Sequence, residues 1–256
     1  MSNREARTFS ATAVVLRHLD YGETDRILTL FTLEHGKIKA IAKGVRRIQS
    51  RKAGHLEPLT QVRLFLARGR DLAVITQVDT LTPWLKLKDN LQLMGSAVYM
   101  LELLERFTLE EGANRDLYLL LVDSLNRLQE NPNTTTVVHY YEVRLLDLLG
   151  FRPNLKTCVV CSTEIKPEDQ YFSAQGGGVV CPRCVHNHPD AWKVSMPALK
   201  YFRHFQRSKY SQVKGFLIPE PAEKELAALI ERYMTVLLER SLKSTQFLRD
   251  IASPEN

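Results

Sequence analysis

Apolar residues in the first eighty positions follow the pattern of short β-strands, being β-branched or alternating with polar residues. The five segments are 13–16, 26–31, 37–43, 61–67 and 72–78. Between the last two, Arg68-Gly69-Arg70-Asp71 has the length and the glycine of a hairpin loop. Five short strands without a long helix predict a small barrel that closes its own edges. The pattern leaves two architectures open, an OB-type barrel and an SH3-like barrel.

After Pro83 the apolar period becomes helical. A stripe at spacings of three and four predicts the first long helix, and it consists of Leu91, Met94, Val98, Leu101 and Leu104. Further helices are predicted at 115–130, from Asn133 to Leu149 with Gly150 after its end, from Ser195 onwards, and from Pro221 to about Leu242. We expect an α+β protein: a barrel domain at 1–82 and a helical domain at 83–256, with a loop-rich insertion at 154–192 and a frayed tail at 252–256.

All four cysteines lie in that insertion, as two C-x2-C pairs, Cys158/Cys161 and Cys181/Cys184. Two such turns supply four thiolates to one tetrahedral metal, so we predict a zinc site. Disulfides and free thiols are the alternatives, and a reducing cytoplasm disfavours the first. A closed four-thiolate site leaves no position for a water nucleophile, so the metal is expected to be structural.

Two features near the cysteines are assigned no chemistry. His186 and His188 follow the second pair, but the ligand set is already complete, so a solvated loop is the better interpretation. The triple glycine 176–178 lacks the Lys-Ser or Lys-Thr of a phosphate-binding loop. We expect a hairpin turn there.

Charge is distributed unevenly along the chain. Residues 1–80 contain 14 Lys or Arg against 8 Asp or Glu, and this excess equals the net charge of +6 of the whole chain. The stretch 36–52 contains no acid, and its basic residues are Lys37, Lys39, Lys43, Arg46, Arg47, Arg51 and Lys52. A cationic groove of this kind follows phosphates, so we predict that these seven residues bind DNA, with a solvated basic loop as the alternative.

Aromatic side chains that could stack on bases are few in the barrel. Of Phe9, Tyr21, Phe31 and Phe65, the last two are assigned to the core. Binding dominated by the nucleic-acid backbone is therefore expected.

A second acid-free stretch, 193–216, lies in the neutral half of the chain. Its cations are Lys193, Lys200, Arg203, Arg207, Lys209 and Lys214. On a helix, Lys200, Arg203 and Arg207 share a face, whereas Phe202 and Phe205 point to the core. Three interpretations stay open: a second nucleic-acid contact, a dock for an acidic and apolar peptide, or a plain amphipathic helix with a wet basic face.

No catalytic motif is recognisable. HExxH, G-x-S-x-G and Walker sequences are absent, and Glu23 with Asp25 makes a poor Mg²⁺ site without further acids nearby. An ion pair between Arg26 and an acid at the barrel entrance is the better interpretation. We therefore expect no enzyme, with a zinc-containing nuclease or nucleic-acid-modifying enzyme as the alternative. A sequence-specific regulator would need a helix-turn-helix, and none is convincing.

Nothing in the sequence suggests export or a membrane. Residues 1–10 are polar without an apolar h-region, and no stretch approaches the roughly 20 apolar residues of a membrane span. A cytoplasmic location is expected.

Several motifs together resemble the bacterial RecO family of DNA repair proteins. They are the segments 21–32 (YGETDRILTLFT), 34–37 (EHGK), 42–47 (AKGVRR), 56–59 (LEPL), 148–153 (LLGFRP), 158–161 (CVVC) and 177–181 (GGVVC), in the same order as in that family and at the expected chain length. The resemblance implies an N-terminal OB-fold, an α-helical domain and an inserted zinc module, for which this chain retains all four cysteines.

The resemblance also implies a recombination mediator associated with the nucleoid. Such a protein binds single- and double-stranded DNA, anneals complementary strands, and acts with RecR in the RecFOR pathway to load RecA onto DNA covered by single-stranded DNA-binding protein. The acidic C-terminal tail of that last protein docks on the helical domain. No docking residue is carried over, and the stretch 193–214 is our hypothesis for the tail site.

Overall fold

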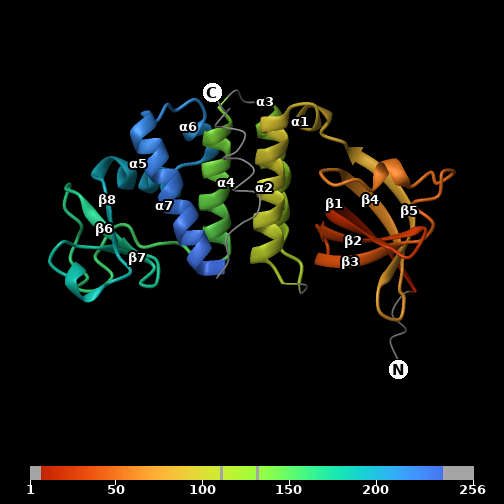
Figure 1. Cartoon of the computed structure of the whole chain (residues 1–256), viewed down its shortest axis with the longest axis horizontal. Coiled ribbons are helices and arrows are strands. Elements are labelled where there is room, and N and C mark those ends of the chain that lie inside the picture. The colour runs from red at the N-terminus through yellow and green to blue at the C-terminus, as the bar shows by residue number, and fades with distance from the viewer. Residues whose placement is uncertain (1–6, 110–111, 131–132, 239–256) are drawn as a thin grey trace. The chain divides into compact units, whose positions relative to one another are not determined.

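The computed structural model describes residues 7–109, 112–130 and 133–238 of the chain, which form two compact units (Figure 1). The first unit contains the described residues up to Glu130, and the second contains those from Asn133 onwards. Within the described ranges, no helix has both the length and the apolar character needed to cross a membrane.

The first unit begins with a closed five-stranded barrel. Its strands are β1 (Thr8–Tyr21), β2 (Asp25–Thr32), β3 (Gly36–Ala42), β4 (Gln61–Ala67) and β5 (Ala73–Thr82). The order around the barrel is β1-β2-β3-β5-β4, with β4 pairing back to β1; β3 and β5 run parallel, and all other pairs are antiparallel. This order is that of an OB-fold, so the choice that periodicity left open is decided.

Alternation along the strands builds the barrel core. Fully buried residues such as Val15, Leu28, Ala40 and Leu64 occupy every second position and point inward. A bulge between Val15 and Arg17 lets the long strand β1 bend and pair with both β2 and β4. The core therefore dictates which residues of β1, β2, β3 and β5 face outward.

Three helices complete the first unit: α1 (Leu85–Lys88), α2 (Leu91–Phe107) and α3 (Arg115–Glu130). The Asn90 side chain caps α2 by accepting from the backbone N–H groups of the second and third helical residues. The predicted apolar stripe of α2 is only partly right, because Leu91 is 54% and Val98 40% exposed, whereas Ala97 and Met100 are buried. Apolar residues occur on most sides of this helix, so its sequence is compatible with more than one choice of buried face.

The second unit contains the helices α4 (Thr134–Leu148), α5 (Met196–Arg207), α6 (Tyr210–Val213) and α7 (Glu220–Leu238). The predicted caps are confirmed: Asn133 accepts from Thr136 N, Ser195 accepts from Ala198 N, and Gly150 takes a positive φ after α4. The predicted end near Leu242 and the tail 252–256 lie outside the described residues.

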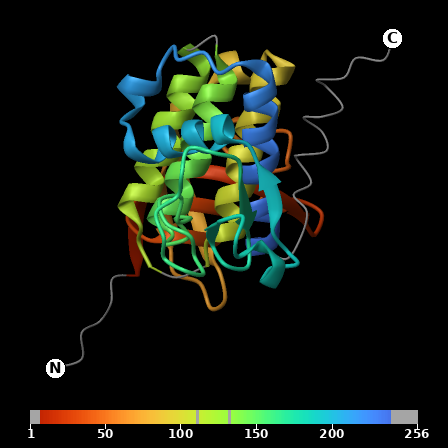
Figure 2. The same ribbon diagram turned by 90° about the vertical axis from the view of Figure 1, so that its left-hand side faces the viewer.

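The insertion is more ordered than the sequence predicts. A three-stranded antiparallel sheet consists of β6 (Gln170–Ser173), β7 (Gly178–Val180) and β8 (Trp192–Val194), in the order β7-β6-β8. Figure 2 shows the insertion in green to teal. The triple glycine forms the expected turn between β6 and β7, with Gly177 at a φ of +68°. Gly178 is needed for a close approach, because a Cβ there would lie 2.3 Å from the carbonyl oxygen of Asn154.

The structure groups α1, α2 and α3 with the barrel. This grouping is based on contacts between residues and does not test where one domain ends. The domain boundary at residue 82 therefore stays a prediction.

Candidate nucleic-acid surface and metal centre

The outer face of the barrel has an apolar row that crosses four strands. Leu19 pairs with Ile27, Ile27 with Ile41, and Ile41 with Val74, so one residue each of β1, β2, β3 and β5 stands side by side. Leu28, Ala40, Ala42 and Ile75, which stand next to Ile27, Ile41 and Val74 along their strands, belong to the core. The side chains of the row, with Leu19 in register, therefore point outward. Leu19 is 57% exposed and the other three are half-buried. We call these four residues the aliphatic row.

The next rows toward α2 carry cations that the helix engages. Arg17 forms an ion pair with Glu105 of α2 (2.5 Å). Lys37 donates its ammonium to the backbone oxygens of Glu105 (2.7 Å) and Thr108. Lys37 therefore satisfies carbonyls at the C-terminal end of α2, where a positive charge is favoured.

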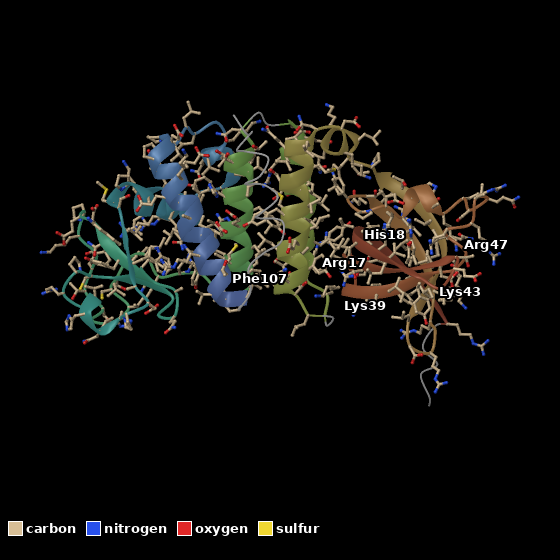
Figure 3. All side chains as sticks on the ribbon, viewed as in Figure 1. Arg17, His18, Lys39, Lys43, Arg47 and Phe107 are labelled. Carbon is tan, nitrogen blue, oxygen red and sulfur yellow. The ribbon has the colours of Figure 1, made fainter. Side chains whose placement is uncertain are left out.

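The predicted basic residues continue along β3 and into the loop that follows it. Lys39, Lys43 and Arg47 follow one another away from α2 (Figure 3). Lys39, Lys43, Arg46, Arg47 and Arg51 are exposed, and Lys52 is half-buried. Lys43, Arg47 and Arg51 form no ion pair with any residue that the structure describes.

Hydrogen bonds hold this loop in place. Asp25 accepts from Gly44 N (2.7 Å) and from the Thr24 hydroxyl (3.0 Å), and the first of these bonds lowers the pKa of the Asp25 carboxyl. Lys52 donates to the backbone oxygens of Lys43 (3.2 Å) and Ile75 (3.3 Å). The exposed cations therefore stand on an ordered loop.

The barrel entrance has the ion pair that the sequence predicts for Arg26. Its partners are Asp20 (3.1 Å) and Glu57 (2.9 Å). Arg46 also contacts Asp20 (3.3 Å), so part of its charge is offset. Asp25 has other bonds, and the pair that the sequence suggested for a metal, Glu23 with Asp25, gathers no further acid among the described residues.

The aromatic residues divide between core and surface. Phe31 is 1% exposed, as predicted, but Phe65 is 42% exposed, so its assignment to the core is wrong. Its neighbours Leu64 and Leu66 fill the barrel, and alternation turns Phe65 outward. Tyr21 is 56% exposed at the end of β1.

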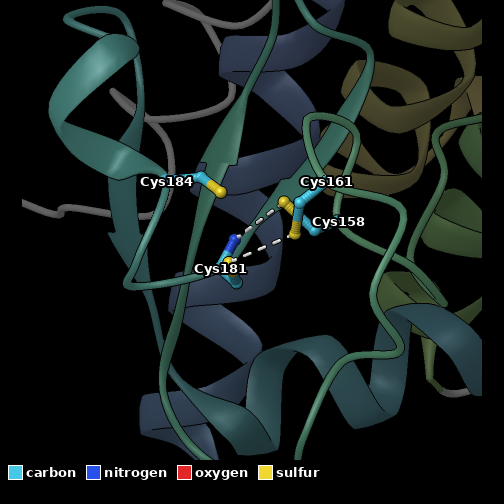
Figure 4. A group of neighbouring side chains, drawn as sticks. All are labelled: Cys158, Cys161, Cys181 and Cys184. Atoms are coloured by element: carbon cyan, nitrogen blue, oxygen red, sulfur yellow. Dashed lines mark hydrogen bonds between the residues drawn. The ribbon is translucent and has the colours of Figure 1, made fainter.

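The four cysteines converge as predicted (Figure 4). All four are free thiols whose sulfur atoms lie within 4.8 Å of one another, and those of Cys161 and Cys181 are 3.8 Å apart. Tetrahedral zinc with Zn–S bonds of about 2.3 Å places its sulfurs about 3.8 Å apart, so this set fits the ion. Hydrogen bonds with Thr163 lower the pKa of the Cys161 thiol to about 6, which favours the thiolate that a metal needs.

The sheet of the insertion positions these ligands. The first cysteine pair precedes β6, and the second follows β7 directly. Cys181 N donates to the Cys158 sulfur (3.3 Å), which ties the two pairs together. His186 and His188 lie outside the cluster, and Nδ1 of His188 is 3.8 Å from Asp190.

The second basic stretch contributes residues to two separate pockets. Phe202 and Phe205 are buried, as predicted. Lys200 lines a pocket of about 530 Å³ with Met196 and Tyr201, whereas Arg203 and Arg207 line a separate cleft. The shared face of the three cations stays a prediction.

The other cations of this stretch, Lys193, Lys209 and Lys214, are exposed, and Lys193 pairs with Asp169 (3.2 Å). The cleft of Arg203 and Arg207 also contains Lys156, which sequence analysis missed because it lies far away along the chain.

Comparison with known proteins gives consistent matches along the chain. The family model "Recombination protein O N terminal" matches residues 6–84, and "Recombination protein O C terminal" matches residues 89–246. The chain is 34% identical over 246 residues to "DNA repair protein RecO" of Roseiflexus sp. (strain RS-1), covering 96% of this chain and 86% of that protein. The protein of the same name in Dehalococcoides mccartyi (strain CBDB1) is 33% identical over 240 residues, 94% of each chain.

Proposed function

This chain belongs to the RecO family of DNA repair and recombination proteins, and on that basis we propose that it binds DNA through the outer face of its barrel. The observation that carries the proposal is the position of exposed cations on an ordered loop beside the aliphatic row. Cations on this loop neutralise phosphates and release counterions, which gives affinity without sequence readout. The exposed cations are Lys43, Arg46, Arg47 and Arg51 on the loop and Lys39 on β3. Lys52, which is half-buried, and Lys37, which also serves α2, belong to the same predicted set.

The aliphatic row adds a contact that does not depend on charge. Leu19 and its neighbours offer apolar surface to bases or sugars of a splayed strand, but no aromatic ring lies in the row for stacking. Such a surface accepts single strands and the backbone of a duplex alike. Because it neutralises phosphates, it also lowers the repulsion between complementary strands, which supports annealing.

The second unit supports the protein partners that the family implies. The pocket beside Lys200 is lined by Met196, Tyr201 and Pro221, so it offers an apolar side chain a place next to a cation. This combination suits an acidic, apolar peptide, and we assign it to the C-terminal tail of single-stranded DNA-binding protein. Action with RecR, and through it the loading of RecA in association with the nucleoid, belongs to the same proposal.

The cysteine cluster completes the proposal as a structural zinc site. Cys158, Cys161, Cys181 and Cys184 would hold the ion, which links the two pairs around a segment with a small core. Four thiolates leave no open coordination position, so a binding protein fits this site better than a zinc-dependent nuclease.

Binding isotherms on single-stranded DNA at several salt concentrations test the barrel surface. For the variant K43Q/R47Q/R51Q we expect the slope of log affinity against log salt to fall by about 0.7 for each phosphate contact removed, the single-strand value. Arg63→Gln, an exposed change on β4 outside the loop, shows how much the loss of one positive charge elsewhere on the barrel changes the slope. Equal slopes for the triple variant and the wild type would remove this loop from the interface. The same preparations, incubated with labelled complementary strands and metal, separate annealing from cleavage.

A further inference from the structure

The second unit contains a small polar cleft between the first cysteine pair and α5. Its volume is about 220 Å³, and its lining residues are Lys156, Glu164, Ile165, Arg203 and Arg207. Three of the five carry positive charge and one carries negative charge. Lys156 and Arg207 are exposed, and none of the three cations forms an ion pair with a described acid. The cleft is therefore cationic on balance, and its one acidic lining residue, Glu164, forms an ion pair with none of the three cations.

Arg203 carries a buried hydrogen-bond donor that has no acceptor in this cleft. Its Nε donates to the backbone oxygen of Leu155 (2.7 Å), but its Nη2 is buried and has no hydrogen-bond partner. Burial and the neighbouring Arg207 guanidinium both lower the pKa of Arg203, and no acid acts in the opposite direction. A buried guanidinium N–H without an acceptor is costly, and an anion in the cleft offsets the repulsion between the two arginines.

Two separate parts of the fold bring the cations together. Lys156 precedes Cys158 by two residues; its N–H donates to the Asn154 side chain (3.0 Å), and its carbonyl accepts from Ile165 N (2.9 Å). Arg203 and Arg207 stand one turn apart on α5. The cleft therefore exists only when the cysteine-bearing segment is folded against α5.

We propose that this cleft binds a phosphate of the DNA backbone and is a second DNA contact, independent of the barrel. Two guanidinium groups and an ammonium suit a phosphate, which accepts bidentate bonds from arginine. A peptide carboxylate is the competing ligand, but Ile165 is the one apolar lining residue. The cleft thus offers an apolar peptide side chain little surface, unlike the pocket beside Lys200.

The inference rests on the proposed function, since it presumes that the chain binds DNA. It adds that each unit carries its own backbone contact. Two strands, or two segments of one strand, then bind one chain at the same time, which is what annealing requires.

The test is the variant K156Q/R207Q, which removes two exposed charges and leaves the Arg203 hydrogen bond in place. We expect its salt slope on single-stranded DNA to fall by about 1.4 relative to the wild type, the value for two phosphate contacts on a single strand. The control K86Q/K166Q removes the same charge from exposed positions outside the cleft and should keep the wild-type slope. If the salt slope falls equally in both variants, the fall reflects the loss of net positive charge and not of a specific contact. That result would overturn the assignment.

Further outcomes separate this inference from the proposed function. If K43Q/R47Q/R51Q loses binding while K156Q/R207Q keeps the wild-type slope, the cleft assignment fails and the barrel proposal stands. If the wild type shows no salt-dependent DNA binding, both fail. If K156Q/R207Q binds DNA normally but no longer binds a fluorescent acidic peptide, the ligand is a carboxylate and the phosphate assignment is wrong.

Discussion

Lys37 offers a sharp test of how the basic stretch is divided between folding and binding. Its ammonium bonds to the backbone oxygens of Glu105 and Thr108 at the C-terminal end of α2. Lys43, six residues later, is exposed and forms no ion pair with a described residue. The two lysines look equivalent in the sequence, yet we expect their substitutions to have opposite effects.

We expect Lys37→Met to destabilise the first unit by about 2 kcal/mol, because hydrogen bonds to a charged group contribute about 1.5–3 kcal/mol and water replaces part of the loss at a half-buried site. For a unit of this size the change lowers Tm by roughly 5–10 °C. Lys43→Gln should leave Tm unchanged and reduce the salt slope of DNA binding by about 0.7–0.9.

Calorimetry and binding isotherms on both variants provide the measurement. Arg63→Gln, at an exposed position of β4, controls for the loss of one positive charge. The reasoning is refuted if Lys37→Met keeps the wild-type Tm and lowers the salt slope as much as Lys43→Gln does. In that case Lys37 acts on DNA, and its bonds to α2 contribute little.

Three other predictions concern the aliphatic row, the zinc site and Asp25. Leu19→Ala should weaken single-strand binding without changing its salt slope, because an apolar contact releases no counterions; a changed slope would contradict this. Cys158→Ser should release zinc, measured as metal content, and lower the Tm of the second unit, and an unchanged melting curve would contradict a structural role. The lowered pKa of Asp25 means that its carboxylate stabilises the fold above the ordinary pKa of about 3.9. This contribution should disappear as the pH falls through the lowered pKa, and Asp25→Asn should lack that step in an acid titration of stability.

The sequence predicted the barrel well because alternation is a local signal. Each strand carries its own pattern, and the turns between strands are marked by glycine. The strand order that identifies the OB-fold depends on pairings such as Ile41 with Val74, which no local pattern contains. Phe65 was misassigned for a related reason: a strand of aliphatic and aromatic residues indicates two faces without saying which one is buried.

The insertion shows a second limit. Its strands have three or four residues, too short for a period to be recognised, so it was interpreted as loops. The cysteines were predicted correctly because their spacing is itself a geometric constraint. The sequence predicted charged surfaces from runs of basic residues. The side chains around Lys37 and Lys156, however, come from segments that are distant in the chain. A run of basic residues therefore locates a surface but does not say which of its members the fold has already engaged.

We expect zinc binding by the cysteines to be coupled to DNA binding in the cleft. Lys156 is held by the segment that leads into Cys158, so removal of zinc should displace Lys156 from the arginines of α5. We expect chelation to lower the salt slope of the wild type but to change K156Q/R207Q little, because that variant has already lost the affected contact. The two perturbations should therefore be non-additive. Additive losses would mean that the metal acts on DNA binding by another route, and no effect of chelation on the wild-type slope would mean that the segment keeps its place without the ion. The binding isotherms of the two proteins, with and without chelator, decide between these results.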